Sequence, residues 1–198
     1  MSKGKEPRHY VLHCEPGKYE IQGGEVTFWT QRRYDRRWHD DAVKEASREG
    51  ADARRREIIF AVCLAESYLF EWVATVVQRE YPGARKAVEQ YWTESVTKKW
   101  KRVPKILSKE GMLRQRPDLG GPHGKEWKRL VNCRNGLVHA KASLAYSPDM
   151  DPKDPERPVP TYQDLEELEP GWALGLVVER IRRLHEAAGT SPPEWLSS

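Results

Sequence analysis

Apolar positions follow two different patterns along this chain, one up to residue 51 and another after it. The first stretch contains HYVLHCEPGKYEIQGGEVTFWTQRRY, in which β-branched and aromatic residues are interrupted by Pro-Gly and Gly-Gly pairs. Such interruptions are typical of short strands joined by turns. The pattern therefore predicts an N-terminal extension, residues 1–51, that is irregular or forms a β-hairpin.

After residue 51, apolar residues recur at helical spacing, and glycines and prolines divide them into segments. The pattern predicts four main helices, over residues 54–81, 84–102, 127–145 and 172–188. The first carries apolar residues on nearly every side, which is typical of a buried central helix. Pro82-Gly83 ends it, Pro104 is expected to bend or break the second helix before a short basic one, and Gly189 stops the last.

The predicted fold class is all-α, a compact up-and-down bundle of about four to five helices over residues 52–189. A Gly- and Pro-rich loop precedes the third helix. An acidic Pro-rich loop follows that helix over residues 147–160, and residues 190–198 form a C-terminal tail.

Composition favours one globular domain, because 198 residues can bury a core and eight Trp and eight Tyr supply large apolar surfaces. The chain has no run of about 18 apolar residues, as a membrane span needs, and MSKGKEPRHY lacks the apolar core of a signal peptide. We therefore expect a cytoplasmic protein without membrane contact. Its cysteines, Cys14, Cys63 and Cys133, show no paired spacing and are expected to be free thiols.

Charge is distributed unevenly, although the net charge is only +4. Residues 85–134 carry 14 Lys and Arg against 5 Asp and Glu, whereas residues 149–179 carry 2 against 9. The basic block is able to meet a polyanion. A solvated helix face would give the same composition, so charge alone does not separate the two interpretations.

The third helix places a charge where a core residue is expected. On an ideal helix Arg134 falls near the centre of an apolar stripe, which consists of Trp127, Leu130, Val131, Leu137, Val138 and Ala145. A guanidinium there needs a partner, since it cannot lose its charge. Glu66 of the first helix also falls among apolar positions, so we predict a Glu66–Arg134 contact. A buried ion pair with a structural role is the alternative, and another arginine is equally able to neutralise Glu66.

Two further polar residues share a face of this helix. Asn135 and His139 lie four residues apart, whereas His139 is about 140° away from Arg134. One undistorted helix therefore cannot direct Arg134 and His139 at the same small group. Either Gly136 loosens the turn, or the second half of a site comes from elsewhere, such as a two-fold related copy of the chain.

The segment CRNGLVHA resembles the signature of the HEPN superfamily, in which an Arg, often followed by Asn, precedes a His by four to six residues. Other pairs in this chain have a similar spacing, namely Arg32 and Arg33 with His39, Arg116 with His123, and Arg180 with His185. Only Arg134 is followed by Asn and lies on the penultimate predicted helix. Upstream, FAVCLAESYLFEW resembles the first family helix and matches its acidic position to Glu66. The resemblance covers residues 52–189.

The resemblance implies a helical bundle that acts as a metal-independent endoribonuclease at a dimer interface. His139 would transfer the proton of the ribose 2′-hydroxyl, and Arg134 would hold the phosphate. Asn135 would orient His139 or contact the phosphate. Glu66 would hold Arg134 in position without contacting the RNA itself. The products would be a 2′,3′-cyclic phosphate and a 5′-hydroxyl.

The basic block would guide RNA, with contacts expected from Lys98, Lys99, Lys101, Arg102, Lys128 and Arg129. Trp92, Trp100 and Trp127 are possible stacking surfaces for bases, but we expect at least two of them to be core residues. His123 is expected in a loop, and His185 on a helix surface.

Family members act in toxin–antitoxin and antiphage defence systems, so a cognate antitoxin or regulatory protein is an expected partner beside RNA and a second copy. Some are controlled by modification of a tyrosine two residues after the His; here that position is Lys141, which argues against such control. The alternative is a catalytically inactive HEPN-like RNA-binding or scaffolding module, or a regulator that binds nucleotide or nucleic acid. His9, His13 and Cys14 have the residue types of a metal site, but no second cluster follows, so no metal or other cofactor is expected.

Overall fold

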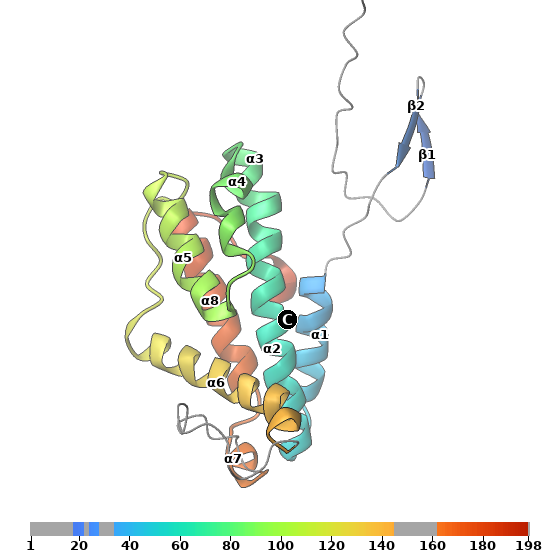
Figure 1. Cartoon of the computed structure of the whole chain (residues 1–198), viewed down its shortest axis with the longest axis vertical. Coiled ribbons are helices and arrows are strands. Elements are labelled where there is room, and N and C mark those ends of the chain that lie inside the picture. Colours follow the sequence, from blue (N-terminus) through green and yellow to red (C-terminus); the bar gives the residue numbers. More distant parts are fainter. Residues whose placement is uncertain (1–17, 22–23, 28–33, 145–161, 198) are drawn as a thin grey trace, which may run out of the picture. The chain divides into compact units, whose positions relative to one another are not determined.

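The computed structural model describes residues 18–21, 24–27, 34–144 and 162–197 (Figure 1). The chain divides into two units, Met1–Arg33 and Tyr34–Ser198. In the first unit, β1 (Lys18–Ile21) and β2 (Gly24–Thr27) form an antiparallel hairpin in which Tyr19 is opposite Val26. The acidic loop at 147–160 and the residues His9, His13 and Cys14 lie outside the described residues.

The second unit is an all-α bundle, as predicted. Its elements are α1 (Tyr34–Ala46), α2 (Ala51–Trp72), a π-helical turn η1 (Val73–Val77), α3 (Gln78–Glu80), α4 (Ala84–Val88), a 3-10 turn η2 (Glu89–Tyr91), α5 (Val96–Lys109), α6 (Gly121–Leu144), α7 (Tyr162–Glu166), α8 (Trp172–Ala188) and a 3-10 turn η3 (Glu194–Ser197). The last helix has the predicted bounds, and Gly189 ends it in the left-handed conformation, with φ of 69°.

Helix α2 is the centre of the bundle, which confirms the prediction from its all-round apolar pattern. It packs against α1, α5, α6, α7 and α8 (Figure 1). By length and composition alone, Ala51–Glu80 also contains an 18-residue window that is apolar enough to cross a membrane. Most of that window is buried inside the bundle, so tertiary packing accounts for its apolar composition.

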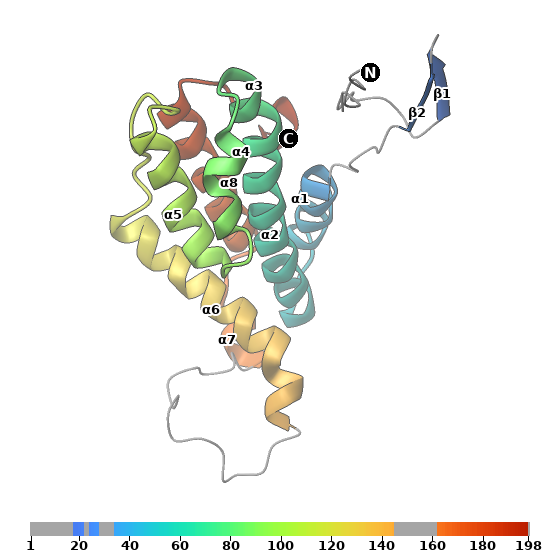
Figure 2. The same cartoon turned by 45° about the horizontal axis from the view of Figure 1, so that its top comes forward.

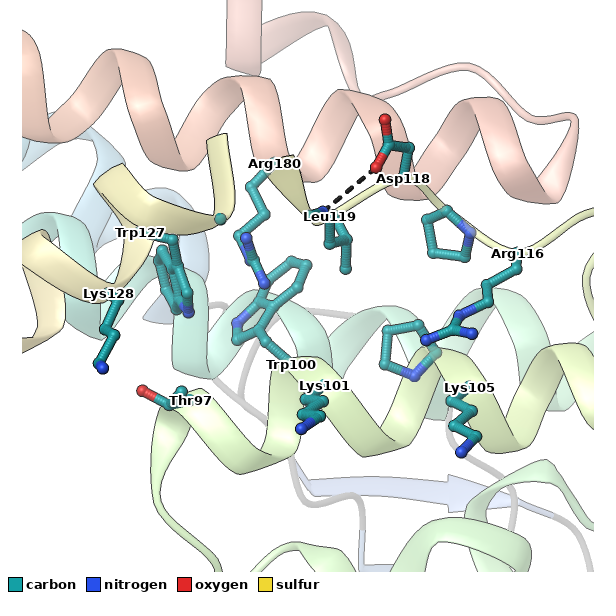
Figure 3. A pocket seen from close by; sticks show the side chains of 14 residues that line it. Thr97, Trp100, Lys101, Lys105, Arg116, Asp118, Leu119, Trp127, Lys128 and Arg180 are labelled. Atoms are coloured by element: carbon teal, nitrogen blue, oxygen red, sulfur yellow. Dashed lines mark hydrogen bonds between the residues drawn. The ribbon is translucent and has the colours of Figure 1, made fainter. Parts of the chain in front are cut away.

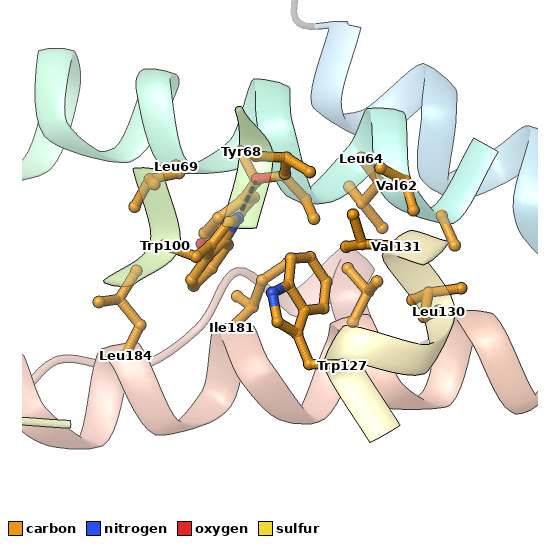
Figure 4. Close-up of a cluster of buried hydrophobic side chains, with 14 of the residues drawn as sticks. Val62, Leu64, Tyr68, Leu69, Trp100, Trp127, Leu130, Val131, Ile181 and Leu184 are labelled. Atoms are coloured by element: carbon orange, nitrogen blue, oxygen red, sulfur yellow. Dashed lines mark hydrogen bonds between the residues drawn. The ribbon is translucent and has the colours of Figure 1, made fainter. Parts of the chain in front are cut away.

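Two tryptophans join α5 and α6 to this core. Trp100 and Trp127 are almost completely buried, with ring centroids 6.0 Å apart at an angle of 60° (Figure 4). The indole Nε1–H of Trp100 donates to the carbonyl of Ala65 at 3.0 Å. Neither indole is therefore an open stacking surface for RNA, whereas Trp92 is half-buried and packs edge-to-face on Phe70.

A buried ion pair on α2 binds the ends of two other helices. Arg54 donates to Glu57, and its Nη2 also donates to the Glu45 carbonyl near the C-terminus of α1 at 2.9 Å. Glu57 accepts hydrogen bonds from the backbone amides of Ala173 and Leu174 at 3.0 and 3.2 Å. A cation thus meets the negative end of α1, and an anion meets the positive end of α8.

Helix α1 corrects the predicted domain boundary, because residues 34–46 were assigned to the N-terminal extension. The helix packs on α2 and buries Asp35, His39, Ala42 and Glu45. These positions have helical spacing, but three of the four are polar. A search for apolar periodicity therefore does not detect this helix.

The predicted second helix is also corrected. The chain turns after Tyr91, with Ser95 in an extended conformation, and α5 then continues through Pro104 to Lys109. Proline removes one backbone hydrogen bond, at a cost of about 3 kcal/mol. The complete burial of Trp100, Val103 and Leu107 on this helix offsets that cost.

The start of the predicted third helix and the predicted C-terminal tail differ as well. Helix α6 begins at Gly121, earlier than predicted, and Pro122 occupies its first turn, where a missing N–H costs nothing. The predicted C-terminal tail packs back on the bundle. Leu196 is buried, and Trp195 contacts the rings of His39 and Tyr68 at 5.1 and 6.1 Å.

Candidate functional site

Helix α6 carries the three predicted catalytic residues and is continuous from Gly121 to Leu144. Gly136 is buried within it and does not interrupt the helix. The backbone positions of Arg134 and His139 therefore keep the separation of about 140° that an α-helix imposes. The side chain of His139 lies outside the described part of the structure.

Arg134 is half-buried on α6, which packs against α2, and its charge acts on Cys63 of α2. Its Nη1 donates to Oδ1 of the neighbouring Asn135 at 3.2 Å. Its Nε is buried and has no hydrogen-bond partner, and no carboxylate among the described side chains pairs with it. The charge of the guanidinium is thus not compensated by any described carboxylate, and at least one of its N–H groups has no acceptor.

Glu66, which we predicted to contact Arg134, forms its ion pair with Lys99 of α5 instead. Only 13% of the Lys99 side chain is exposed, so its ammonium needs an acceptor, and Glu66 is within reach. Glu66 and Arg134 nevertheless act on the same neighbour. Burial raises the pKa of the Cys63 thiol, the positive charge of Arg134 lowers it, and the negative charge of Glu66 raises it. Cys63 therefore lies near both charges, where α2 meets α6.

The apolar stripe around Arg134 is covered only in part. Leu130, Val131 and Leu137 are buried as predicted, whereas 43% of Val138 is exposed. Figure 2 shows that α6 crosses α2 obliquely, so that α2 lies against α6 along only part of α6. Arg134 consequently lies close to the point where the face of α6 becomes accessible.

The six lysines and arginines predicted to bind RNA fall into three groups. Lys101 and Lys128 are exposed and line a pocket between α5 and α6 (Figure 3). Lys99, by contrast, is mostly buried against Glu66.

The other three have carboxylate neighbours on the surface. Lys98 and Arg102 share Glu94, at 4.0 and 3.4 Å, and Arg129 is 3.4 Å from Glu126. Exposed pairs of this kind are weak, so these side chains are able to exchange partners.

The histidines of the other Arg-to-His pairs occupy structural positions in the bundle. His123 lies in the first turn of α6 rather than in a loop, and His39 is buried. His185 was expected on a helix surface, but it is 3% exposed. Its Nε2 lies 2.6 Å from the Tyr68 hydroxyl, and its Nδ1 lies 2.7 Å from Oγ1 of Thr190.

The buried His185 makes stability depend on pH. Burial lowers the pKa of His185 to about 4, from an ordinary value of 6.5. The folded protein therefore holds the neutral ring, and its stability is complete above pH 6.5 and declines as the pH falls toward 4. We expect the free energy of unfolding to fall by about 2–3 kcal/mol between pH 7 and pH 4.5 through this group.

Urea unfolding of wild type and His185→Gln at both pH values measures this effect. Glutamine can donate and accept hydrogen bonds but does not titrate in this range. The variant should lose less stability than wild type by the stated amount. Equal losses in the two proteins would show that other groups cause the acid sensitivity.

Sequence reasoning missed Arg180, although the signal was available. On α8 this residue lies on the same buried face as Val177, Ile181 and Leu184. The geometry of an ideal helix, which placed Arg134 on an apolar stripe, also places Arg180 on one. The side chain of Arg180 is the more deeply buried of the two. In both α6 and α8, an arginine on a predicted apolar stripe thus indicated a guanidinium that is at least half-buried.

No protein-family model, curated protein or solved structure matches this chain. Among the described residues there is no group of three or more His, Cys, Asp and Glu side chains that could hold a metal ion. The functional interpretation therefore depends on the side chains of α6 and their surroundings.

Proposed function

We propose that this protein is a metal-independent endoribonuclease of HEPN type, with an active site shared between two copies of the chain. The RNA would supply its own nucleophile, the ribose 2′-hydroxyl, which attacks the adjacent phosphate. The 5′-oxygen of the next nucleotide leaves, so the products are a 2′,3′-cyclic phosphate and a 5′-hydroxyl. The reaction needs an acid–base group and a cation to stabilise charge on the phosphate.

The observation that carries this proposal is the state of Arg134. Its guanidinium has no carboxylate partner among the described side chains and keeps a buried Nε without an acceptor. Asn135 holds Nη1 at 3.2 Å and so restrains the orientation of the group. A phosphate, which accepts two N–H donors from arginine, fits such a guanidinium.

His139 supplies the acid–base chemistry in this proposal. A histidine titrates near neutral pH, so it can accept the proton of the 2′-hydroxyl and donate one to the leaving oxygen. Because α6 is unbroken at Gly136, Arg134 and His139 of one chain diverge. Two copies related by a two-fold axis would bring Arg134 of one chain to His139 of the other.

The exposed cations Lys98, Arg102 and Arg129 support a role with RNA, because their surface ion pairs are weak and leave positive charge along α5 and α6 able to contact phosphates. From the resemblance to the HEPN superfamily we propose a toxin–antitoxin or antiphage defence role, and from the composition of the sequence we propose that the enzyme works in the cytoplasm. A cognate antitoxin or regulatory protein would then control it.

The test is cleavage of a defined RNA by the purified protein in a buffer with a metal chelator. We expect cleavage with cyclic phosphate ends, and no cleavage by Arg134→Gln. The matched control is Lys125→Gln, which removes an exposed cation from the same helix at a position that is not predicted to contact RNA.

Binding without cleavage would contradict the enzymatic proposal and favour the RNA-binding or scaffolding module. Cleavage that requires a divalent metal would contradict the metal-independent mechanism. Equal loss of activity in the Lys125 and Arg134 variants would indicate a general effect of charge on RNA binding.

A further inference from the structure

A pocket of about 640 Å³ lies on the bundle between α5, the start of α6 and α8 (Figure 3). A loop that includes Arg116 and Asp118 closes one side. The volume is in the range of sites for small molecules, which is about 300–1,000 Å³. The proposed ribonuclease chemistry at Arg134 does not use this pocket, since Arg134 is not part of its lining.

The lining is strongly basic. Its cations come from four separate parts of the chain and are Lys101, Lys105, Arg116, Lys128 and Arg180. The one acidic side chain of the lining, Asp118, accepts a hydrogen bond from the backbone amide of Gly120 at 3.2 Å, beside the start of α6. Gly120 and Gly124 also line the pocket, so the positive end of this long helix faces the same space.

Arg180 lies at the inner wall of the pocket and is 3% exposed. Its guanidinium carbon is 4.3 Å from the ring centroid of Trp127 and 5.2 Å from that of Trp100, and Figure 3 shows it between the two rings. Its Nε and Nη1 are buried without a hydrogen-bond partner, and no described carboxylate pairs with it.

This arrangement leaves the charge of Arg180 only partly compensated. Indole faces attract a cation, but they do not replace the hydrogen bonds that a guanidinium makes with water. Burial, and then the nearby Arg183, lower the pKa of Arg180 to about 9. A bound anion would supply both the missing acceptors and the missing countercharge.

We propose that this pocket binds a small molecule that carries two or more phosphate groups. Five cations from α5, α6, α8 and the adjoining loop are too widely distributed for one phosphate to contact them all. A terminal phosphate offers three oxygens and is able to reach the buried Arg180, whereas a phosphodiester within a strand continues on both sides. Because Arg180 covers Trp100 and Trp127, the indoles do not stack on a base, and recognition depends on the phosphates.

Isothermal titration with tripolyphosphate, in metal-free buffer at constant ionic strength, tests this proposal. We expect the double variant Lys105→Gln/Lys128→Gln to raise the dissociation constant by about tenfold or more. The matched control is Lys109→Gln/Lys125→Gln, which also removes one exposed lysine from α5 and one from α6, but outside the lining. The control should change the constant by less than about twofold.

Arg180→Met provides a second test, with thermal unfolding as the check that the variant folds. Loss of binding in this folded variant supports the proposal, and the lysine pairs decide the matter if it does not fold. Absence of tripolyphosphate binding at millimolar concentration, or equal weakening in both lysine pairs, would overturn it. Inorganic phosphate binding as tightly as tripolyphosphate would also overturn it.

An RNA oligonucleotide with 5′-hydroxyl ends distinguishes the pocket from a general RNA surface. It has phosphodiesters but no terminal phosphate, so we expect it not to displace tripolyphosphate at equal phosphate concentration. Displacement would overturn the proposal in favour of an RNA backbone site. None of these measurements depends on RNA cleavage, so they succeed or fail separately from the ribonuclease proposal.

Discussion

Replacing His139 with alanine is expected to lower the rate of RNA cleavage by about 10²–10⁴-fold, the usual contribution of a general acid–base group. The reason is that alanine can neither take the proton of the 2′-hydroxyl nor return one to the leaving oxygen. RNA affinity should change little, because a histidine that is mostly neutral at pH 7 adds little charge. Single-turnover cleavage of a labelled RNA, in chelator, separates the chemical step from binding.

Asn132→Ala is the matched control for this variant, since Asn132 is an exposed residue of the same helix. It should cleave like wild type, and circular dichroism should show both variants to be folded. If His139→Ala keeps wild-type activity, the enzymatic proposal fails, whatever the behaviour of Arg134.

A mixture of two inactive variants tests whether two chains share the site. A dimer of one Arg134→Gln chain and one His139→Ala chain keeps one intact site, if that site takes Arg134 and His139 from different chains. After exchange of subunits, roughly a quarter of the wild-type activity should return, because half of the dimers are mixed and each has one of two sites. No recovery would exclude the shared site but not ribonuclease activity.

Glu57→Gln is expected to lower the free energy of unfolding by about 3–5 kcal/mol, the effect of removing one partner from a buried ion pair. The substitution leaves Arg54 buried, 3% exposed, with its charge uncompensated. It also weakens the acceptor for the amides of Ala173 and Leu174 at the start of α8. Urea unfolding at pH 7 measures the change.

Asp52→Asn is the control, because it removes the same charge from the same helix at an exposed position. Its cost should be below about 1 kcal/mol. The double variant Arg54→Met/Glu57→Gln should be less destabilised than the sum of its single variants, since the uncompensated cation is gone. Additive effects would contradict the interpretation of these residues as one coupled pair.

Apolar periodicity in the sequence predicts those helices that bury a continuous apolar surface. Apolar residues at helical spacing identified α2 as the central helix and α8 at its observed bounds, because both bury continuous apolar surface. Helix α1 was missed because Asp35, His39 and Glu45 occupy its buried face. Polar groups are buried where partners from elsewhere in the chain contact them. The sequence pattern of one helix carries no information about those partners.

The candidate site shows the same limit at the level of single contacts. A helical wheel gives the direction of a side chain but not the neighbour that it meets. It correctly directed Glu66 and Arg134 toward a common region near Cys63, but it could not indicate that Lys99 would reach Glu66 first. Arg180 needed no additional principle, only the same argument applied to the last helix.

The acceptor for the first turn of α8 has a consequence for the order of folding. Gly171, at the N-cap of α8, has no side chain that could accept hydrogen bonds from the first amides. Glu57, which lies 116 residues before Ala173 in the sequence, accepts them instead. The first turn of α8 is therefore incomplete until α2 is in place, which couples the last helix to the first half of the bundle. The amides of Ala173 and Leu174 should then exchange with solvent only when the whole bundle opens, and not by local fraying.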